Sequence, residues 1–408
     1  MKSQNYLVAF AAGYFLSYLY RSINAVISPE LTRDLALAPG SLGLLTSAYF
    51  IAFAIVQLPA GILLDRYGPR RVEPVLLAVA GAGALLFALA DSVAGLVVAR
   101  AFIGAGAAVC LMAPLKAIAT WCPRERQASR AAWVMTAGGT GALVATTPTE
   151  LALRYVDWRA LFVGVALLTF GVAVWIWIRV PDTPKPKQAH RLRAQWEGLR
   201  GVYANARFWW IAPLGGAVMG TFFGLQGLWS VPWLIEVVGY DRAVAARHLL
   251  VMGVATLAGF TGLGLFATRL AQRDVHPRHI FALGFALNVV ALAAILAQLP
   301  GTYLWWGLYG LGASTNILGF AVLGDGFAKD LAGRVNTALN LLVFSCGFAA
   351  QWGIGLVVDA ARTALGLGTA GGLKLALGFA LLLNVVAYAW FMWGWRRHAA
   401  VVHETAGA

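Results

Sequence analysis

Long apolar runs follow one another along almost the whole chain. Each contains 20 to 28 residues, enough for a helix to cross the roughly 30 Å hydrocarbon core of a membrane. Apolar residues are continuous within each run rather than alternating, which favours helices over the strands of a β-barrel. The pattern therefore predicts an all-α membrane protein with twelve transmembrane helices, at 5–28, 41–64, 72–91, 94–119, 130–152, 159–179, 208–235, 245–267, 279–299, 303–323, 335–358 and 372–395.

The composition supports a membrane protein and excludes the usual soluble classes. Of the 408 residues, 60% are apolar and only 12% are charged, whereas about a quarter are charged in soluble domains. A soluble chain of this size could not cover so much apolar surface with polar groups. Two of the three cysteines lie inside apolar runs and the third beside a basic loop, so no disulfide is expected. An ordinary cytosolic enzyme, a disordered chain and a secreted disulfide scaffold are therefore excluded.

One long polar segment, 181–207, divides the runs into two groups of six. It begins with a stiff, basic, proline-rich stretch. Apolar residues then recur at helical spacing, at Leu192, Trp196, Leu199 and Tyr203. This spacing favours an amphipathic helix on the membrane surface, and a solvated linker is the alternative. The predicted units are an N-terminal six-helix bundle (1–180), a cytoplasmic linker (181–207), a C-terminal six-helix bundle (208–398) and a cytoplasmic tail (399–408).

Basic residues are unevenly distributed between the two sides that the spans define. Of the 31 Lys and Arg residues, 21 fall on the side of the linker, 7 fall on the other side and 3 lie within spans. Loops rich in Lys and Arg stay in the cytoplasm, so the linker and both termini are predicted to be cytoplasmic in an inner (plasma) membrane. The net charge of +14 has the same origin, and no nucleic-acid partner is expected.

The two groups of six spans repeat each other. Residues 61–70 (GILLDRYGPR) recur 203 residues later as 264–273 (GLFATRLAQR), with Gly, Arg and Arg in register. Residues 28–29 (Ser-Pro) align with 231–232 (Val-Pro) at the same offset. An offset close to half the chain indicates a duplication, and hence two pseudo-symmetric halves of six helices. In transporters built from such repeats, the substrate binds between the halves near the membrane midplane.

The most specific motif of the chain lies between the second and third spans and reads GILLDRYGPRR, residues 61–71. It resembles the loop signature of the major facilitator superfamily, and residues 100–106 (RAFIGAG) look like that family's second motif. Twelve spans, the long central loop and the half repeat extend the resemblance to the whole chain. The resemblance implies a cytoplasmic gate that latches against the eleventh span; a basic loop that only sets the topology is the alternative. The implied gating residues are Gly61, Asp65, Arg66, Gly68 and Arg70.

Arg21 lies well inside the first span. An arginine within the membrane costs several kcal/mol unless it faces a polar cavity or a partner. Its helical stripe carries further polar and aromatic residues, Tyr14, Tyr18, Asn24 and Ser28. Such a stripe is expected on the wall of a water-filled cavity, so Arg21, Tyr18 and Asn24 are candidates for substrate binding. The alternative is snorkelling, since Arg21 lies only seven residues, or about 10 Å, from the outer end of the span.

Residues of other spans complete the candidate site. Arg100 in the fourth span is assigned equally to substrate binding and to packing or gating. No acidic residue lies clearly at mid-depth, and buried cations without acidic partners favour an anionic substrate. The remaining candidates could instead pack between helices or lie at the membrane interface; they are Gln226, Trp229, Tyr309, Asn316 and Asn340.

Within the superfamily, the position of Arg21 resembles two branches that carry anions. The anion:cation symporters have an Asp-Arg pair in the first span, and the organophosphate:phosphate antiporters have an Arg there. This chain has Tyr20 in place of the acid. The antiporters' second Arg, in the seventh span, is absent, and Thr221, Gln226 and Trp229 stand in that region. The sequence therefore decides neither whether a proton is the coupling ion nor whether the protein exchanges phosphate.

These observations favour a secondary transporter that moves a small organic anion, such as a carboxylate metabolite or a siderophore, by alternating access. A multidrug exporter for lipophilic compounds is the alternative. Zinc-type His and Cys spacing, a Walker loop and a Gly-x-Ser-x-Gly motif do not occur in the sequence. No catalytic residue, metal site or cofactor is expected, and the chain is predicted not to be an enzyme and to act as a monomer in the lipid bilayer.

The predicted orientation can be tested with single cysteines labelled from one side of the membrane. Lys187→Cys in the linker and Thr405→Cys in the tail should react with an impermeant maleimide only from the cytoplasm, because the positive-inside rule places both segments there. Gly366→Cys should react only from outside. Labelling of intact spheroplasts and of inverted vesicles measures this, and the reverse pattern would overturn the orientation.

Overall fold

The computed structural model of the protein describes residues 5–182, 192–272, 276–324, 327 and 331–406, and every regular element among them is a helix. The N-terminal half contains α1 (Asn5–Leu35), α2 (Pro39–Tyr67), α3 (Pro69–Leu89), α4 (Val93–Ala107), α5 (Met112–Trp121), α6 (Arg124–Val144), α7 (Thr147–Ala152) and α8 (Trp158–Arg179). The linker contains α9 (Leu192–Tyr203). The C-terminal half contains α10 (Ala206–Gly224), the π-helical turn η1 (Leu225–Trp229), α11 (Ser230–Glu236), α12 (Arg242–Gln272), α13 (Pro277–Leu296), α14 (Thr302–Ser314), α15 (Ile317–Gly324), α16 (Ala332–Leu365) and α17 (Thr369–Ala406).

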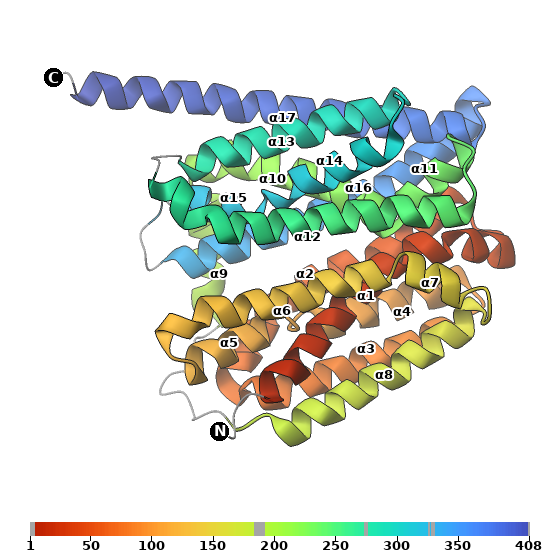
Figure 1. Ribbon diagram of the computed structural model, residues 1–408, viewed down its shortest axis with the longest axis horizontal. Coiled ribbons are helices and arrows are strands. Elements are labelled where there is room, and N and C mark those ends of the chain that lie inside the picture. Colours follow the sequence, from red (N-terminus) through yellow and green to blue (C-terminus); the bar gives the residue numbers. More distant parts are fainter. Residues whose placement is uncertain (1–4, 183–191, 273–275, 325–326, 328–330, 407–408) are drawn as a thin grey trace.

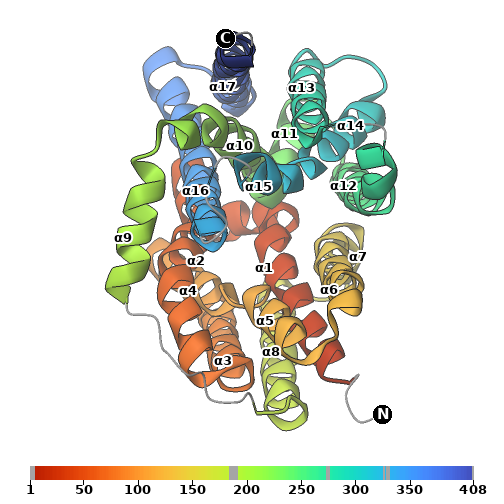
Figure 2. The ribbon, with the colours of Figure 1, turned by 90° about the vertical axis from the view of Figure 1, so that its left-hand side faces the viewer.

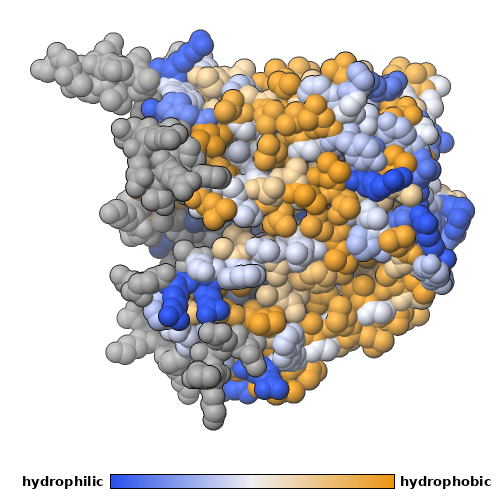
Figure 3. Space-filling view, viewed as in Figure 1, coloured by the Kyte–Doolittle hydropathy of each residue, from blue (hydrophilic) through white to orange (hydrophobic). Residues whose placement is uncertain are grey.

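These helices make twelve membrane crossings, because α4–α5, α6–α7, α10–η1–α11 and α14–α15 each form a single crossing. In the described part of the chain, ten crossings are long and apolar enough to span a membrane by length and composition. The other two are α1, which carries Arg21, and α6–α7, which begins with charged residues. Figure 3 shows a broad apolar surface between more polar rims. The all-α fold with twelve transmembrane helices is therefore confirmed.

The crossings form two bundles, with α1–α8 below and α10–α17 above in Figure 1. The bundles meet where α2 packs along α16, where α1 crosses η1 and α11, and where α6 and α7 contact α12. The linker helix α9 lies on one flank (Figure 2), packed against α16. We call the end of the molecule that holds α9 and the start of α1 the linker end, and the opposite end the far end.

Two of the predicted units, the linker and the tail, fall partly on helices of the structure. The basic stretch expected at the start of the linker falls mostly at 183–191, outside the described residues. In α9, Leu199 and Val202 are buried, and the Tyr203 hydroxyl donates to Ala338 O at 3.0 Å. The last helix, α17, continues through most of the predicted cytoplasmic tail, 399–408, as far as Ala406.

Several crossings are interrupted in the interior of the bundles. The fourth crossing breaks at 108–111 and its counterpart in the second half, the tenth, breaks at 315–316. The seventh crossing contains η1, whereas α1, its counterpart, runs without a break. Irregular turns at membrane depth are tolerated where protein buries them or where they line a cavity, and π turns often occur at functional sites. The sequence pattern gives no sign of these breaks, because apolar residues continue through them.

The gating motif owes one of its glycines to a tight turn. α2 ends at Tyr67 because Gly68 adopts a φ of 78°, which glycine reaches without strain. The Gly68 N–H donates to Leu64 O at 3.0 Å, and Pro69 begins α3 at the next residue. Two antiparallel crossings are therefore joined through a single residue.

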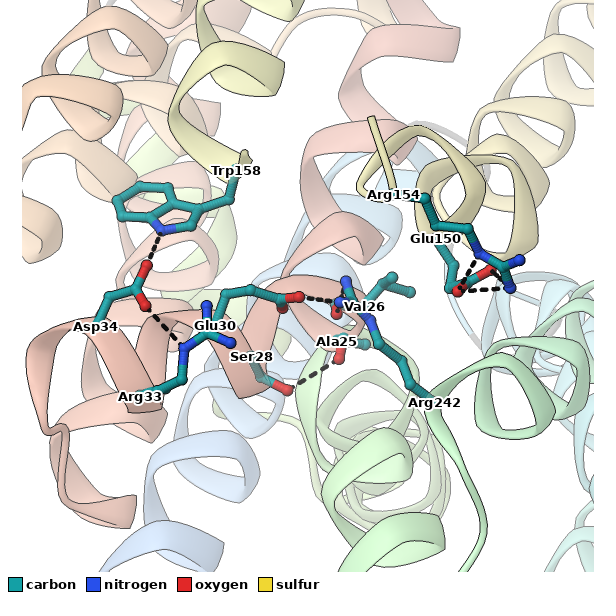
Figure 4. A network of polar contacts seen from close by, with 10 residues as sticks. All are labelled: Ala25, Val26, Ser28, Glu30, Arg33, Asp34, Glu150, Arg154, Trp158 and Arg242. Carbon is teal, nitrogen blue, oxygen red and sulfur yellow. Dashed lines mark hydrogen bonds and ion pairs between the residues drawn. The ribbon is translucent and has the colours of Figure 1, made fainter. Parts of the chain in front are cut away.

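Polar contacts join the two bundles at the far end. Arg242, which begins α12, pairs with Glu30 of α1 and donates to Val26 O at 3.1 Å (Figure 4). The carboxylate of Asp359, in α16, accepts a hydrogen bond of 2.7 Å from the backbone N–H of Gly40. Between pairs of described residues, all hydrogen bonds and ion pairs from one bundle to the other lie at this end. The structure is therefore in a conformation closed at the far end.

Glycines let α2 and α16 approach closely at this closure. A Cβ added to Gly355 would lie 2.4 Å from Pro39 O, and one added to Gly43 would lie 2.8 Å from Gln351 O. Both distances are shorter than side chains tolerate against a rigid backbone. Small residues at helix contacts are the usual device for close packing within a membrane, so closure at the far end requires glycine at both positions.

Replacing Gly355 should therefore oppose closure. We expect Gly355→Ala to cost about 1–3 kcal/mol in the closed state through overpacking, which shifts the open-to-closed ratio roughly 5- to 150-fold. The readout is the distance distribution between spin labels at the exposed positions 33 and 362, which should gain a longer component. Gly353→Ala is the matched control, because a Cβ there meets nothing within 4 Å. An unchanged distribution in Gly355→Ala would show that this contact does not control closure.

Candidate functional site

Arg21 lies in α1, where the two bundles meet, and its side chain is buried. Five aromatic rings surround its guanidinium group, with 4.5 to 5.9 Å between the guanidinium carbon and the ring centroids. Four helices of the two bundles contribute them. We call this set the Arg21 cage: Tyr18 of α1, Tyr49 and Phe53 of α2, Phe223 of α10 and Phe344 of α16.

The positive charge of Arg21 is not paired with a carboxylate of the described residues. Within the described residues no Asp or Glu forms an ion pair with it, and its Nε is buried without a hydrogen-bond partner. A ring face stabilises a nearby cation by roughly 0.5–2 kcal/mol, but it cannot accept the directed hydrogen bonds of a guanidinium as an anion does. The cage thus holds the cation in place and leaves it without its strongest type of partner.

Rings of the two bundles stack directly on one another in the cage. Phe53 of α2 stacks on Phe344 of α16 with 4.3 Å between centroids, and Phe344 stacks on Phe223 of α10 at 5.6 Å. Next to them, Phe50 stacks on Phe223 at 5.4 Å. A movement of one bundle against the other must therefore change the surroundings of Arg21.

Tyr18 lies beside Arg21, as their helical stripe predicts. Its ring is the nearest of the cage, at 4.5 Å, and it packs edge-on against Tyr14 at 5.1 Å. Gly138 of α6 makes room for this pair, since a Cβ there would lie 2.5 Å from the Tyr14 ring. Glycine at position 138 is thus explained by its contact with the tyrosines of α1.

Arg100 is fully buried inside the N-terminal bundle. One of its guanidinium nitrogens donates to Tyr20 O at 2.9 Å, and its guanidinium carbon lies 5.4 Å from the Tyr49 ring. The Tyr49 ring thus lies near both arginines. The Tyr20 hydroxyl is 2.8 Å from Thr169 Oγ1 of α8, in the helix contact rather than in the cage. Arg100 thus holds the backbone of α1 at Tyr20, the residue that precedes Arg21.

The other predicted site residues lie outside the cage. The Asn24 side chain donates to Thr46 Oγ1 at 3.1 Å and joins α1 to α2. Trp229, in η1, donates from its indole to Gln351 O at 2.8 Å, and Gln226 in the same turn is buried. Asn24 and Trp229 thus form hydrogen bonds between helices.

The predicted residues of the later crossings are also separate from Arg21. The Tyr309 ring lies 5.6 Å from Phe222, the neighbour of the cage residue Phe223, and its hydroxyl is buried without a partner. Asn316, at the break between α14 and α15, has a buried Oδ1 without a partner. Asn340 is half-buried on α16. Tyr309 and Asn316 therefore retain unused hydrogen-bonding groups on the C-terminal side.

Four of the five cage rings were not among the residues predicted from the sequence. The signal for Tyr49 and Phe53 is their spacing of four residues in the second span. That spacing is equally typical of packing between helices. Phe223 and Phe344 join the cage only through contact between the bundles, which a single sequence does not reveal.

The gating motif is bonded within the N-terminal bundle. Asp65 pairs with Lys116 of α5 at 2.6 Å, and Arg70 pairs at 2.9 Å with Asp182, just after α8. The Arg66 guanidinium lies 5.2 Å from the adjacent ring of Tyr67. Among the residues that the structure describes, no ion pair links the motif to α16. In the conformation closed at the far end, the motif is therefore held by its own bundle.

The chain is similar in sequence and in structure to known membrane transporters. The chain is 22% identical over 309 residues to the "Probable sulfoacetate transporter" of Cupriavidus necator, covering 71% of this chain and 70% of that protein. It is 27% identical over 320 residues to the hexuronate transporter of Escherichia coli K12, covering 72% and 71%. The structure superposes with a TM-score of 0.75 on a bacterial homologue of the human lysosomal transporter Spinster in an inward-facing, unoccupied conformation, with 18% identity and 95% of each chain covered.

The family follows from a match that extends over most of the chain. The model of the Major Facilitator Superfamily matches residues 10–351, which include the gating motif, Arg21 and all of the cage. Its members are transporters rather than enzymes, and the relatives above are transporters too. With twelve crossings in two bundles and a site where the bundles meet, the chain is a multi-span membrane transport protein, and it belongs to the Major Facilitator Superfamily.

Proposed function

We propose that the protein is a secondary transporter of a small organic anion, and that the carboxylate or sulfonate of this anion binds Arg21. The observation that carries the proposal is a buried guanidinium, at the contact of the two bundles, without an acidic partner among the residues that the structure describes. A desolvated guanidinium can donate two parallel hydrogen bonds to a carboxylate. An anion supplied by the substrate would complete the interaction that the chain itself leaves open.

Two relatives support this class of substrate. A hexuronate is a sugar acid with one carboxylate, and sulfoacetate carries a carboxylate and a sulfonate, so both are small and anionic. The aromatic walls of the cage suit a ligand with an apolar or sugar-like body behind its anionic group. Hexuronates such as galacturonate, and sulfoacetate, are therefore the first compounds to test.

A lipophilic multidrug exporter is the alternative, favoured by the five aromatic rings of the cage. Aromatic surroundings bind lipophilic cations well when an acidic residue accompanies them. Here the charged residue within the cage is Arg21, which would repel a cation. The cage thus favours an anion over a cationic drug.

The proposed cycle is alternating access. The two bundles would rock about the cage, opening the far end as the contacts of Arg242 and Asp359 break. The basic linker end would face the cytoplasm, as its excess of Lys and Arg requires. We assign the motif residues Gly61, Asp65, Arg66, Gly68 and Arg70 to the gate at this end. The ion pairs of Asp65 and Arg70 are partly exposed, so each contributes little on its own and can exchange partners.

Arg21 variants test the proposed site directly. Removing one partner of a buried charge pair costs about 2–5 kcal/mol, so Arg21→Ala should weaken anion binding roughly thirtyfold or more. Arg21→Lys keeps the charge but lacks the two-pronged donor, and should bind clearly worse than the wild type. The measurement is the dissociation constant of galacturonate, glucuronate and sulfoacetate for each purified protein.

The control is Arg247→Ala, because Arg247 is an exposed arginine of α12 away from the cage. A snorkelling arginine gives a different result, in which Lys replaces Arg21 fully and Ala is tolerated. Affinity in Arg21→Ala equal to that of the wild type would contradict the anion site and favour the exporter alternative.

A further inference from the structure

Glu73 is a buried acid in the N-terminal bundle. It lies in the first turns of α3, about 6 Å from the linker end of that helix, and its side chain is 0% exposed. Neither carboxyl oxygen has a hydrogen-bond partner. The sequence pattern places no acidic residue clearly at the middle of a membrane span, and Glu73 lies near the start of α3. Its enclosure by neighbouring helices nevertheless removes it from solvent.

The chain makes room for this carboxyl group. A Cβ added to Gly13 of α1 would lie 2.5 Å from Glu73 Oε1, so the absence of a side chain at Gly13 leaves the space that the oxygen occupies. Leu77, one turn further along α3, lies on the same side. The helix α1, which carries Arg21, thus lies directly against the carboxyl group of Glu73.

Among the residues that the structure describes, the ionisable group with an electrostatic interaction with Glu73 is the thiol of Cys110. Cys110, in the break between α4 and α5, is within electrostatic range of both Glu73 and Arg21. On α2, α4, α5 and α8, the helices that pack on α3, the described residues place no cation in ion-pair contact with Glu73. Arg100 of α4 donates to Tyr20 O instead. Lys116 of α5 is already paired with Asp65. A thiol carries no positive charge, so Cys110 does not neutralise the acid.

An ionised carboxylate at this place would lack both a counter-charge and hydrogen bonds. Burial of such a charge costs several kcal/mol, which a neutral carboxylic acid avoids. In the conformation closed at the far end, Glu73 consequently holds a proton. A carboxyl group that binds a proton in one conformation and is brought to solvent in another meets the requirement for coupling proton movement to transport.

We propose that Glu73 binds the coupling proton of an anion–proton symport, an inference that rests on the proposed function. The acid lies between the substrate site and the linker end, since Gly13 precedes Arg21 by eight residues, or about 12 Å along α1. A proton released from Glu73 at the linker end would leave toward the cytoplasm. The proton and the anion would thus be released on the same side.

The coupling follows from the charges. Protonation of Glu73 makes the surroundings of Arg21 more positive by one unit, so the anion binds more tightly to the protonated form. By linkage, the bound anion favours protonation of Glu73 to the same extent. The buried charge of Arg100 adds to the positive field but is the same in both states, so it does not alter this sign.

Transport by reconstituted protein tests the coupling. Glu73→Gln mimics the protonated acid, so galacturonate uptake driven by an acidic exterior should fall at least about tenfold, while exchange of galacturonate across the membrane should stay within about threefold of the wild type. Glu73→Asp keeps a titratable group and should retain part of the driven uptake. The matched control is Glu236→Gln, at an exposed glutamate at the end of α11. Driven uptake equal to the wild type in Glu73→Gln, or an equal loss of uptake and exchange, would overturn the proposal.

A second measurement needs no substrate and separates this proposal from the assignment of the anion. Infrared difference spectra of the purified protein, recorded as pH is raised, should contain a carbonyl band from a protonated carboxyl group that disappears in Glu73→Gln and persists in Glu236→Gln. If galacturonate, glucuronate and sulfoacetate all fail to bind the wild type while this titrating band is present, the substrate assignment is wrong and proton binding by Glu73 stands. If the band is absent, or the same in Glu73→Gln, Glu73 is not the proton site.

Discussion

The cost of burying the charge of Arg21 among apolar helices governs the arrangement at the centre of this protein. Water cannot solvate the guanidinium there, and the chain supplies ring faces instead of a carboxylate. Those faces come from both bundles, so the environment of one side chain depends on how the bundles are placed. A ligand that completes the interaction of Arg21 can therefore bias the position of whole bundles, because it binds their conformations unequally.

The contacts between the bundles divide into two kinds. At the far end, a backbone N–H, an ion pair and glycine contacts require a defined fit between α1, α2, α12 and α16. At the linker end, the charges of the gating motif are paired inside one bundle. Among the described residues, separation of the bundles at the linker end breaks no ion pair, whereas opening at the far end requires several bonds to break together.

Features that depend on the local sequence could be predicted from the chain alone. Run length and continuity predicted the twelve crossings, and a charge inside an apolar run singled out Arg21. The aromatic cage could not be found in this way, because Phe223 and Phe344 become neighbours of Arg21 only when the bundles meet. The enclosure of Glu73 could not be predicted for a related reason. This residue stands at the start of its apolar run, as surface acids commonly do, and only the packing of neighbouring helices on α3 buries it.

The duplication that built the two halves has not kept the charge in both. At the offset of 203 residues, the counterpart of Arg21 is Gly224, which directly precedes the π-helical turn η1. The first half thus supplies the cation and three of the five cage rings. The second half supplies the other two rings and unsatisfied polar groups such as those of Tyr309 and Asn316. In the proposed function, the charge that selects an anion is therefore located on one copy of the repeated unit, whereas the rings that would contact the rest of the ligand come from both copies. On this proposal, substitutions in the second copy would alter the choice among anions of equal charge, over evolution or in a chimera, while Arg21 of the first copy kept the preference for an anion.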